Sequence, residues 1–157
     1  MSKSTGFEID DVLTVTYSYG YGGISPFFES LKEKTGTFKV TRCKTCQLSF
    51  CPPRIHCQKC WDATEWDEHT GEGVIESVVW AYWMPIDSPA RAYTDLPYAY
   101  AAIRLDGCVN LIRVRVEGLD QRQSIESSTG RRGRLSTIDN PTARLGDLKF
   151  VVDPEPV

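Results

Sequence analysis

Histidine is almost absent from this sequence of 157 residues, which contains only His56 and His69. Histidine is the residue most often used for general acid and base catalysis near neutral pH. The sequence also has no Ser-His-Asp order, no Gly-x-Ser-x-Gly motif and no glycine-rich phosphate loop. His69 lies among acidic residues in EWDEHTGEG, where we expect a solvated side chain. The chain therefore offers no catalytic constellation of its own.

Long apolar runs and an excess of positive charge are also missing. No segment approaches the ~20 apolar residues that span a bilayer, and no secretory signal is visible, so we expect a cytoplasmic protein without membrane contact. The 18 basic and 21 acidic residues give a net charge of −3, which argues against nucleic acid as a partner. Hydrophobic residues at 41% and charged residues at 25% are typical of a globular chain with a core.

Cysteine is what the chain does have: six in all, five of them in RCKTCQLSFCPPRIHCQKC, residues 42–60. Cys43-x2-Cys46 and Cys57-x2-Cys60 have the spacing of two zinc knuckles that face each other. Four thiolates complete a tetrahedron around one Zn²⁺ ion and leave no open position for water. We therefore predict one structural zinc ion per chain, whose binding stabilises folding by ~10–16 kcal/mol.

Other ligands and another metal remain open from the spacing alone. Cys51 and His56 lie inside the same stretch, but neither belongs to a paired knuckle. We expect Cys51 and Cys108 to be small buried thiols, and His56 to lie at the surface or beside the ligands. Iron in the same four-sulfur site would make an electron carrier. Gln47 and Trp61 replace the glycines expected after the knuckles of such iron sites, which favours zinc.

The N-terminal half suggests a flexible arm with a short helix, residues 1–36, followed by a zinc ribbon, residues 37–68. The segment SPFFESLKEKTG, residues 25–36, has the signals of a short amphipathic helix: Ser25 as N-cap, Pro26 in the first turn and Gly36 as terminator. TFKVTRC, residues 37–43, alternates like a strand that enters the first knuckle.

The second half predicts an antiparallel β-barrel of about five strands, an OB-fold domain over residues 69–157. Expected strands cover residues 71–83, 97–105, 108–116 and 147–152. Asp106-Gly107 predicts a two-residue hairpin between the second and third of these strands. The polar residues 118–141 are expected to form a long loop.

Two groups of side chains suggest binding rather than packing. Large aromatic residues surround one expected loop, and we expect part of them to form an exposed surface; they are Trp80, Tyr82, Trp83, Tyr93, Tyr98 and Tyr100. Arginines in the expected polar loop are either solvated or candidate contacts for phosphate groups; they are Arg122, Arg131, Arg132 and Arg134.

The chain resembles the zinc-ribbon and OB-fold accessory proteins known as domain of unknown function 35. The resemblance runs from about residue 25 to 116: a helix with PFF, a strand into RCKTCQLSFCPPRIHCQKC, then GEGVIES and LPYAYAAIRLDG. Pro52-Pro53-Arg54 between the knuckles is its most specific mark. The family's zinc ligands correspond to Cys43, Cys46, Cys57 and Cys60. The longer segment 118–146 leaves open whether the last strand closes the barrel within this chain.

The resemblance implies an accessory subunit of a thiolase-type acyl-CoA complex, of which benzoylsuccinyl-CoA thiolase is an example. In that case the partner subunit provides catalysis, and this chain serves as scaffold and borders the CoA thioester, with the four arginines as phosphate contacts. It would not be an enzyme by itself. The alternative is a single-stranded nucleic-acid-binding protein, in which an OB barrel stacks bases on its aromatic residues.

Overall fold

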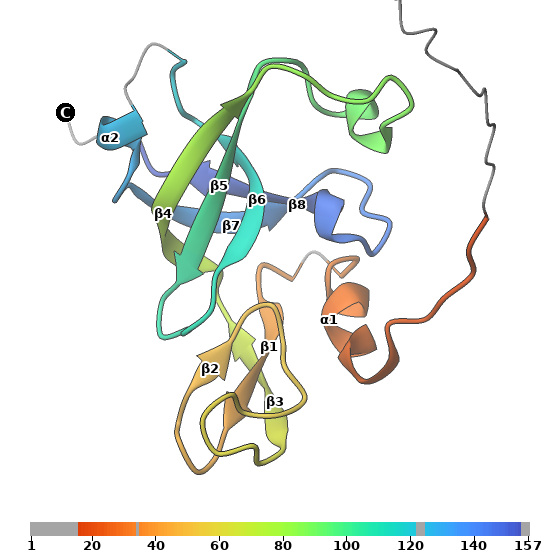
Figure 1. The fold of residues 1–157 in the computed structure, drawn as a ribbon, viewed down its shortest axis with the longest axis vertical. Coiled ribbons are helices and arrows are strands. Elements are labelled where there is room, and N and C mark those ends of the chain that lie inside the picture. Colours follow the sequence, from red (N-terminus) through yellow and green to blue (C-terminus); the bar gives the residue numbers. More distant parts are fainter. Residues whose placement is uncertain (1–15, 34, 122–124, 155–157) are drawn as a thin grey trace, which may run out of the picture.

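The computed structural model describes residues 16–33, 35–121 and 125–154. In this part of the chain a small three-stranded ribbon and a five-stranded barrel lie end to end along the long axis of the molecule (Figure 1). Helices are short, and strands dominate. The expected fold class, a short N-terminal helix, a zinc ribbon and an OB-type barrel, is confirmed.

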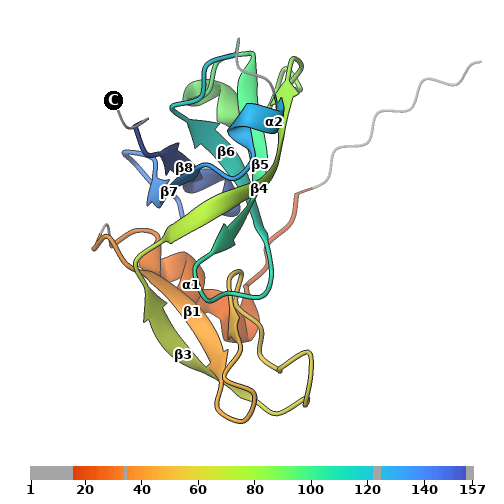
Figure 2. The same cartoon turned by 90° about the vertical axis from the view of Figure 1, so that its left-hand side faces the viewer.

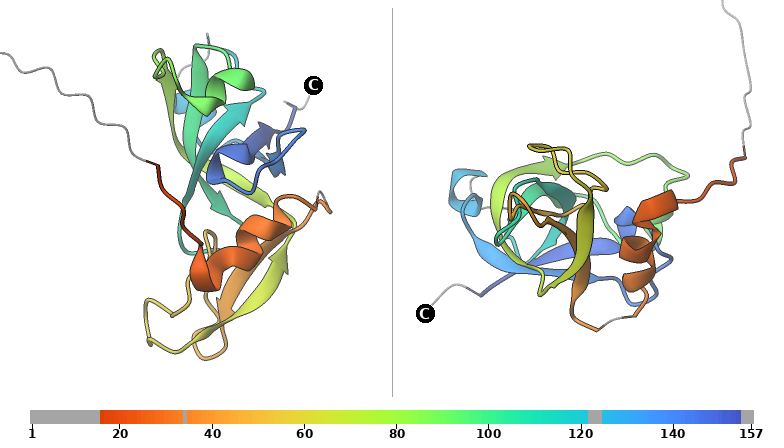
Figure 3. Two further views of the ribbon diagram at one scale, coloured as in Figure 1. Left: turned by 90° about the vertical axis from the view of Figure 1, so that its right-hand side faces the viewer. Right: turned by 90° about the horizontal axis from the view of Figure 1, so that it is seen from below.

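The ribbon begins after a short helical segment. Its antiparallel strands are β1 (Phe38–Cys43), β2 (Ser49–Phe50) and β3 (Thr64–His69), with β1 in the centre. The helical segment consists of a 3₁₀ turn, η1 (Gly22–Ile24), and helix α1 (Ser25–Ser30). Figure 3 shows α1 at the junction between ribbon and barrel.

Helix α1 is shorter than the predicted helix over residues 25–36. Its N-cap is Ile24 rather than Ser25, whose hydroxyl instead donates to the carbonyl of Gly22 at 2.8 Å. The helix does not continue because the segment after Leu31, LysGluLysThrGly, has no apolar side chain that could be buried. Gly36 lies beyond the helix, with φ at +77°.

The barrel is closed. Its strands are β4 (Glu72–Ala81), β5 (Tyr98–Leu105), β6 (Ile112–Glu117), β7 (Arg132–Thr137) and β8 (Leu148–Val152). They follow the order β4-β5-β6-β8-β7, and β7 pairs back onto β4. Only the β6–β8 pair is parallel among these strands. Figure 2 shows the strongly curved β4 crossing the barrel and continuing from the ribbon.

Strand β7 and helix α2 (Ile125–Ser128) lie inside residues 118–141, which were expected to form a long loop. The sequence RRGRLST does not show the apolar alternation by which a strand is predicted. Only Gly133 and Leu135 of β7 are fully buried, and Gly133 has no side chain. A Cβ atom on Gly133 would lie 2.2 Å from the carbonyl oxygen of Val151, so this close pairing with β8 requires glycine. The barrel thus closes within the chain itself.

The connection between β5 and β6 is longer than the predicted two-residue hairpin. Asp106 and Gly107 do form a turn, but β6 starts only at Ile112. The intervening residues contact the ribbon instead. Cys108 forms a parallel β-bridge with Ser49, and the N–H of Val109 donates to the Ser49 carbonyl at 3.0 Å. The hairpin prediction failed because these tertiary contacts leave no trace in local sequence.

One hydrophobic core runs through barrel, helix and ribbon. Phe27, Phe28 and Leu31 of α1, and Phe38 and Val40 of β1, belong to the same buried cluster as the barrel interior. The outer ribbon has a second cluster with only three fully buried residues, Cys43, Phe50 and Cys57. The ribbon's far end therefore lacks an apolar core of useful size and needs another source of stability.

The remaining helical turns are η2 (Pro89–Ala92) in the β4–β5 loop and η3 (Leu145–Asp147) before β8. In the described part of the chain, every helix is too short to cross a bilayer.

Candidate metal centre

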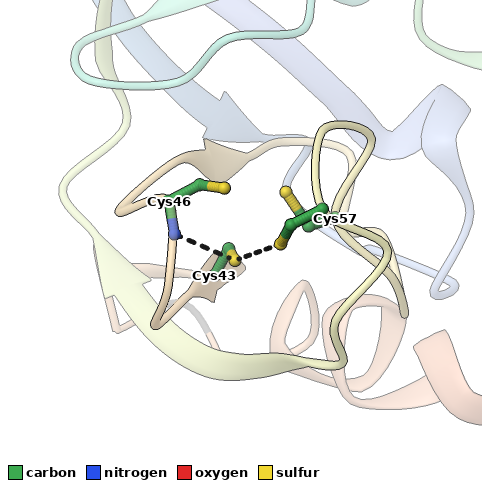
Figure 4. A group of neighbouring side chains, drawn as sticks. Cys43, Cys46 and Cys57 are labelled. Atoms are coloured by element: carbon green, nitrogen blue, oxygen red, sulfur yellow. Dashed lines mark hydrogen bonds between the residues drawn. The ribbon is translucent and has the colours of Figure 1, made fainter.

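Four cysteines converge between the two knuckles of the ribbon. Cys43 ends β1 and Cys46 follows in the next turn, whereas Cys57 and Cys60 come from the β2–β3 connection. Their sulfur atoms all lie within 4.8 Å of one another. Figure 4 shows the sulfurs of Cys43, Cys46 and Cys57 turned toward a common point.

The spacing of these sulfurs fits tetrahedral zinc. With Zn–S bonds of ~2.3 Å, the edges of a tetrahedron measure about 3.8 Å. Cys43 Sγ and Cys60 Sγ are 3.5 Å apart, close to that edge. The four residues predicted from spacing are thus brought together, and four soft sulfur donors without oxygen are the donor set of a structural zinc site.

The two knuckles have equivalent backbone hydrogen bonds. The N–H of Gln47 donates to the carbonyl of Cys43 at 2.8 Å, and the N–H of Trp61 donates to that of Cys57 at 3.0 Å. Gln47 and Trp61 have φ values of +57° and +66°. A left-handed conformation in residues with a Cβ atom costs roughly 1–2 kcal/mol. The left-handed turn directs both sulfurs of a knuckle toward the same ion. The free energy of metal binding therefore offsets the cost of this conformation.

Backbone donors prepare the sulfurs for metal binding. The N–H of Cys46 points at Cys43 Sγ at 3.3 Å, and that of Lys59 points at Cys57 Sγ at 3.4 Å. Hydrogen bonds from the backbone N–H groups of Cys60 and Lys59 lower the pKa of Cys57 to about 7. Zinc binds the thiolate form, so Cys57 is prepared for binding near neutral pH, whereas desolvation and hydrogen bonds to neighbouring thiols raise the pKa of Cys46 and of Cys60, whose protons the metal must displace.

The other candidate ligands lie elsewhere. Cys51 is fully buried in the main core with Cys108, and burial raises the pKa of both thiols. His56 is exposed and pairs with Ala63 through a β-bridge. The four paired cysteines are therefore the only metal-ligating cluster of histidine, cysteine and acidic residues that the described residues form.

His69 is not the freely solvated side chain that its acidic surroundings suggested. Its Nδ1 accepts a hydrogen bond from the N–H of Gly71 at 2.8 Å, so Nε2 carries the proton and donates to the carbonyl of Asp106 at 2.7 Å. Both ring nitrogens are used to join the end of the ribbon to the β5–β6 turn. His69 therefore has no nitrogen left for proton transfer.

Two of the four predicted arginines, Arg132 and Arg134, lie in β7 rather than in a loop, and Arg131 immediately precedes this strand. Arg132 forms an ion pair with Asp106, and Arg134 pairs with Glu72 at 2.5 Å. Arg131 donates to the carbonyl of Asp153 at 2.9 Å. Arg122 lies outside the described residues. A phosphate group at Arg132 or Arg134 would compete with exposed carboxylates, and exposed ion pairs are weak, roughly 0–1 kcal/mol.

The aromatic residues divide as expected into buried and exposed members. Tyr82 and Trp83 are 67% and 75% exposed, whereas Trp80 packs against the core. Among the exposed apolar side chains that were not predicted from sequence, the most exposed of the described residues are Ile86 at 88% and Trp61 at 77%. Neither breaks a local pattern, so only the fold reveals their exposure.

Comparison with known families shows what this ribbon is similar to. Residues 32–67 match the family model of the ChsH2 rubredoxin-like zinc ribbon domain. These residues are similar to a ChsH2-type zinc ribbon. The match spans both knuckles and therefore supports zinc in the ribbon, and it confirms the predicted resemblance to the zinc-ribbon family of domain of unknown function 35.

Two solved structures share the fold of ribbon and barrel together. One is an Ltp2–ChsH2(DUF35) aldolase, with a TM-score of 0.61 and 21% identity, covering 80% of this chain and 91% of that chain. The other is a DUF35-family protein of unknown function from Sulfolobus solfataricus, with a TM-score of 0.58 and 21% identity, covering 86% and 90%. A search of curated proteins gave no match to this sequence.

Proposed function

We propose that this chain is a non-catalytic accessory subunit, which holds one structural zinc ion and assembles with a thiolase-like enzyme acting on acyl-CoA. The observation that carries the proposal is the closed set of four sulfurs. A zinc ion held by four thiolates has no position for water or substrate. It links the two knuckles of a ribbon whose own apolar core is too small, so its role is to stabilise the fold.

Three further reactive groups of the described chain, His69, Cys51 and Cys108, support the same proposal. Both ring nitrogens of His69 are engaged in hydrogen bonds, and Cys51 and Cys108 are buried thiols with raised pKa values. Nucleophilic catalysis needs a nucleophile within hydrogen-bond reach of a base. Turnover is therefore assigned to another subunit.

The likeness in fold to the Ltp2–ChsH2(DUF35) aldolase supports assembly with an enzyme subunit. That structure is an aldolase formed by Ltp2 and the DUF35 protein ChsH2. For this chain, we propose that the partner is thiolase-like and that its substrate is an acyl-CoA. We also propose that the CoA phosphates contact Arg131, Arg132 and Arg134. Phosphate would replace Asp106 and Glu72 as the partner of the latter two arginines.

Co-expression with the enzyme encoded beside this gene tests the proposal. We expect the two chains to elute as one complex and acyl-CoA turnover to appear only in fractions that contain the enzyme subunit. The zinc-loaded chain alone should show no turnover. Turnover by the isolated chain, or separate elution of chains that never associate, would contradict the proposal.

A groove on the barrel is the structural observation in favour of the alternative function, binding of single-stranded nucleic acid. Tyr93, Tyr98 and Tyr100 line it together with Arg113, on the face formed by β5 and β6. OB barrels bind single strands on this face. Salt-dependent binding of a labelled oligonucleotide at micromolar concentration would support that function, and we expect no such binding because the chain is acidic overall.

A further inference from the structure

The β4–β5 loop, residues 82–97, presents three large side chains to solvent. Tyr82, Trp83 and Ile86 are 67%, 75% and 88% exposed, and they lie within five consecutive residues. The loop projects from the end of the barrel that is remote from the ribbon (Figure 1). Scattered apolar residues on a surface are ordinary, but adjacent aromatic residues on one projecting loop are typical of binding surfaces.

This loop is held in place from within. Arg91 donates from Nε to the Pro85 carbonyl at 2.9 Å and from Nη2 to the Met84 carbonyl at 2.8 Å. The Met84 side chain is buried, which anchors the residue between Trp83 and Pro85. A backbone that is already fixed loses little further conformational entropy on binding, which is a property of preorganised surfaces.

The other end of the loop is fixed to the barrel by Arg115 of β6. Its Nη1 donates to the Tyr93 carbonyl at 3.0 Å and to Thr94 Oγ1 at 3.1 Å, and its guanidinium lies 5.0 Å from the centre of the Tyr93 ring. The loop is therefore braced on both sides of η2.

The charges of this loop indicate what it would meet. Asp87 and Asp95 are exposed, and in the described chain neither has a hydrogen-bond or ion-pair partner. Arg91 is the only basic residue of the loop, and its donors are directed at backbone carbonyls. The surface offered is thus apolar and aromatic with a negative rim. Its complement is an apolar pocket edged by lysine or arginine.

We propose that Tyr82, Trp83 and Ile86, with Asp87 and Asp95 at their rim, form a docking surface for the catalytic subunit. This inference rests on the proposed function and adds the surface by which that assembly is made. A lipid bilayer is disfavoured as the occupant, because the carboxylates of Asp87 and Asp95 are repelled by anionic headgroups and outnumber the one cation of the loop, Arg91.

Binding of single-residue variants to the purified catalytic subunit tests the docking surface. Isothermal titration should show affinity reduced by about 30-fold or more for Trp83→Ala, since buried aromatic anchors dominate interface energies. Asp87→Lys should slow association most at low salt. The matched control is Trp61→Ala, which removes an equally exposed tryptophan from the ribbon and should leave the affinity within about threefold.

The possible results distinguish a failure of this docking surface from a failure of the proposed accessory function. Unchanged affinity in Trp83→Ala, with wild-type binding intact, would overturn the docking surface and leave the accessory role standing. Failure of the wild-type chain to bind would overturn both. Trp83-dependent self-association in sedimentation velocity, or Trp83-dependent binding to phosphatidylcholine vesicles, would assign the surface to a different occupant and overturn the inference.

Discussion

Asn110 of the barrel holds Cys51 of the ribbon by a direct hydrogen bond. The N–H of Cys51 donates to Asn110 Oδ1 at 2.7 Å, and Asn110 Nδ2 donates to the carbonyl of the next residue, Pro52, at 2.9 Å. One amide side chain therefore satisfies two backbone groups on the other side of the junction. It fixes how the metal-bearing ribbon sits on the barrel.

Replacing Asn110 with alanine should destabilise this junction. The change leaves the N–H of the fully buried Cys51 without its partner, which costs roughly 1–3 kcal/mol. Urea unfolding followed by circular dichroism measures the loss. Asn140→Ala, at an exposed position of the β7–β8 loop, is the control and should fall within ~0.5 kcal/mol of wild type. Equal stability of both variants would show that the junction does not depend on Asn110.

Closure of the barrel depends on Gly133. A methyl group there would meet the Val151 carbonyl oxygen at 2.2 Å and the Phe150 ring at 2.8 Å. Because the carbonyl belongs to the paired strand and cannot move aside, Gly133→Ala should cost about 3 kcal/mol in the free energy of unfolding. Gly20→Ala, where nothing lies within 4 Å, should cost much less. A wild-type unfolding midpoint in Gly133→Ala would contradict the tight β7–β8 pairing.

Alkylation should distinguish the two buried thiols from the metal ligands. Burial, and to a smaller extent the nearby Asp106 carboxylate, raise the pKa of Cys108 to about 11. Its thiolate fraction is then about 1 in 1,000 at pH 8 and rises about tenfold per pH unit up to that pKa. In the folded zinc-loaded protein, mass spectrometry after iodoacetamide treatment should find Cys51 and Cys108 unmodified at pH 8.

Chelation provides the contrast for that experiment. Removal of zinc should open Cys43, Cys46, Cys57 and Cys60 to alkylation while the two core thiols stay protected, because they lie in the barrel-side core. Rapid modification of Cys108 before chelation would show that its thiol is accessible.

The arginines in and immediately before β7 give a test of CoA contact. In the assembled enzyme, changing Arg131, Arg132 and Arg134 together to alanine should raise the KM for an acyl-CoA substrate with little change in kcat, since phosphate binding is remote from the reacting carbon. The pantetheine thioester of the same acyl group lacks the nucleotide phosphates and serves as control. An unchanged KM for the CoA substrate would exclude these residues as phosphate contacts.

The sequence predicts those features of the fold that depend on interactions between residues close together in the chain. The zinc ligands are predictable because each knuckle is a local turn of four residues, with its geometry contained in its own spacing. The approximate bounds of β4, β5 and β8 also follow from local sequence, because each segment is rich in apolar, β-branched or aromatic residues.

What sequence reasoning missed depends on distant partners. Strand β7 exists because Gly133 fits against Val151, and its sequence carries too few apolar residues to signal a strand. The β5–β6 turn is extended by Asn110 reaching the ribbon, a contact 59 residues away in the chain. Exposure of Ile86 likewise becomes visible only once the barrel is closed.

Zinc K-edge X-ray absorption of the purified chain tests the central claim most directly. The account predicts one zinc ion per chain with four sulfur neighbours near ~2.3 Å and no oxygen or nitrogen in the first shell. A site with three sulfurs and a lighter, exchangeable ligand would contradict it, because such a zinc ion has room to activate water and the chain would no longer need a partner for catalysis.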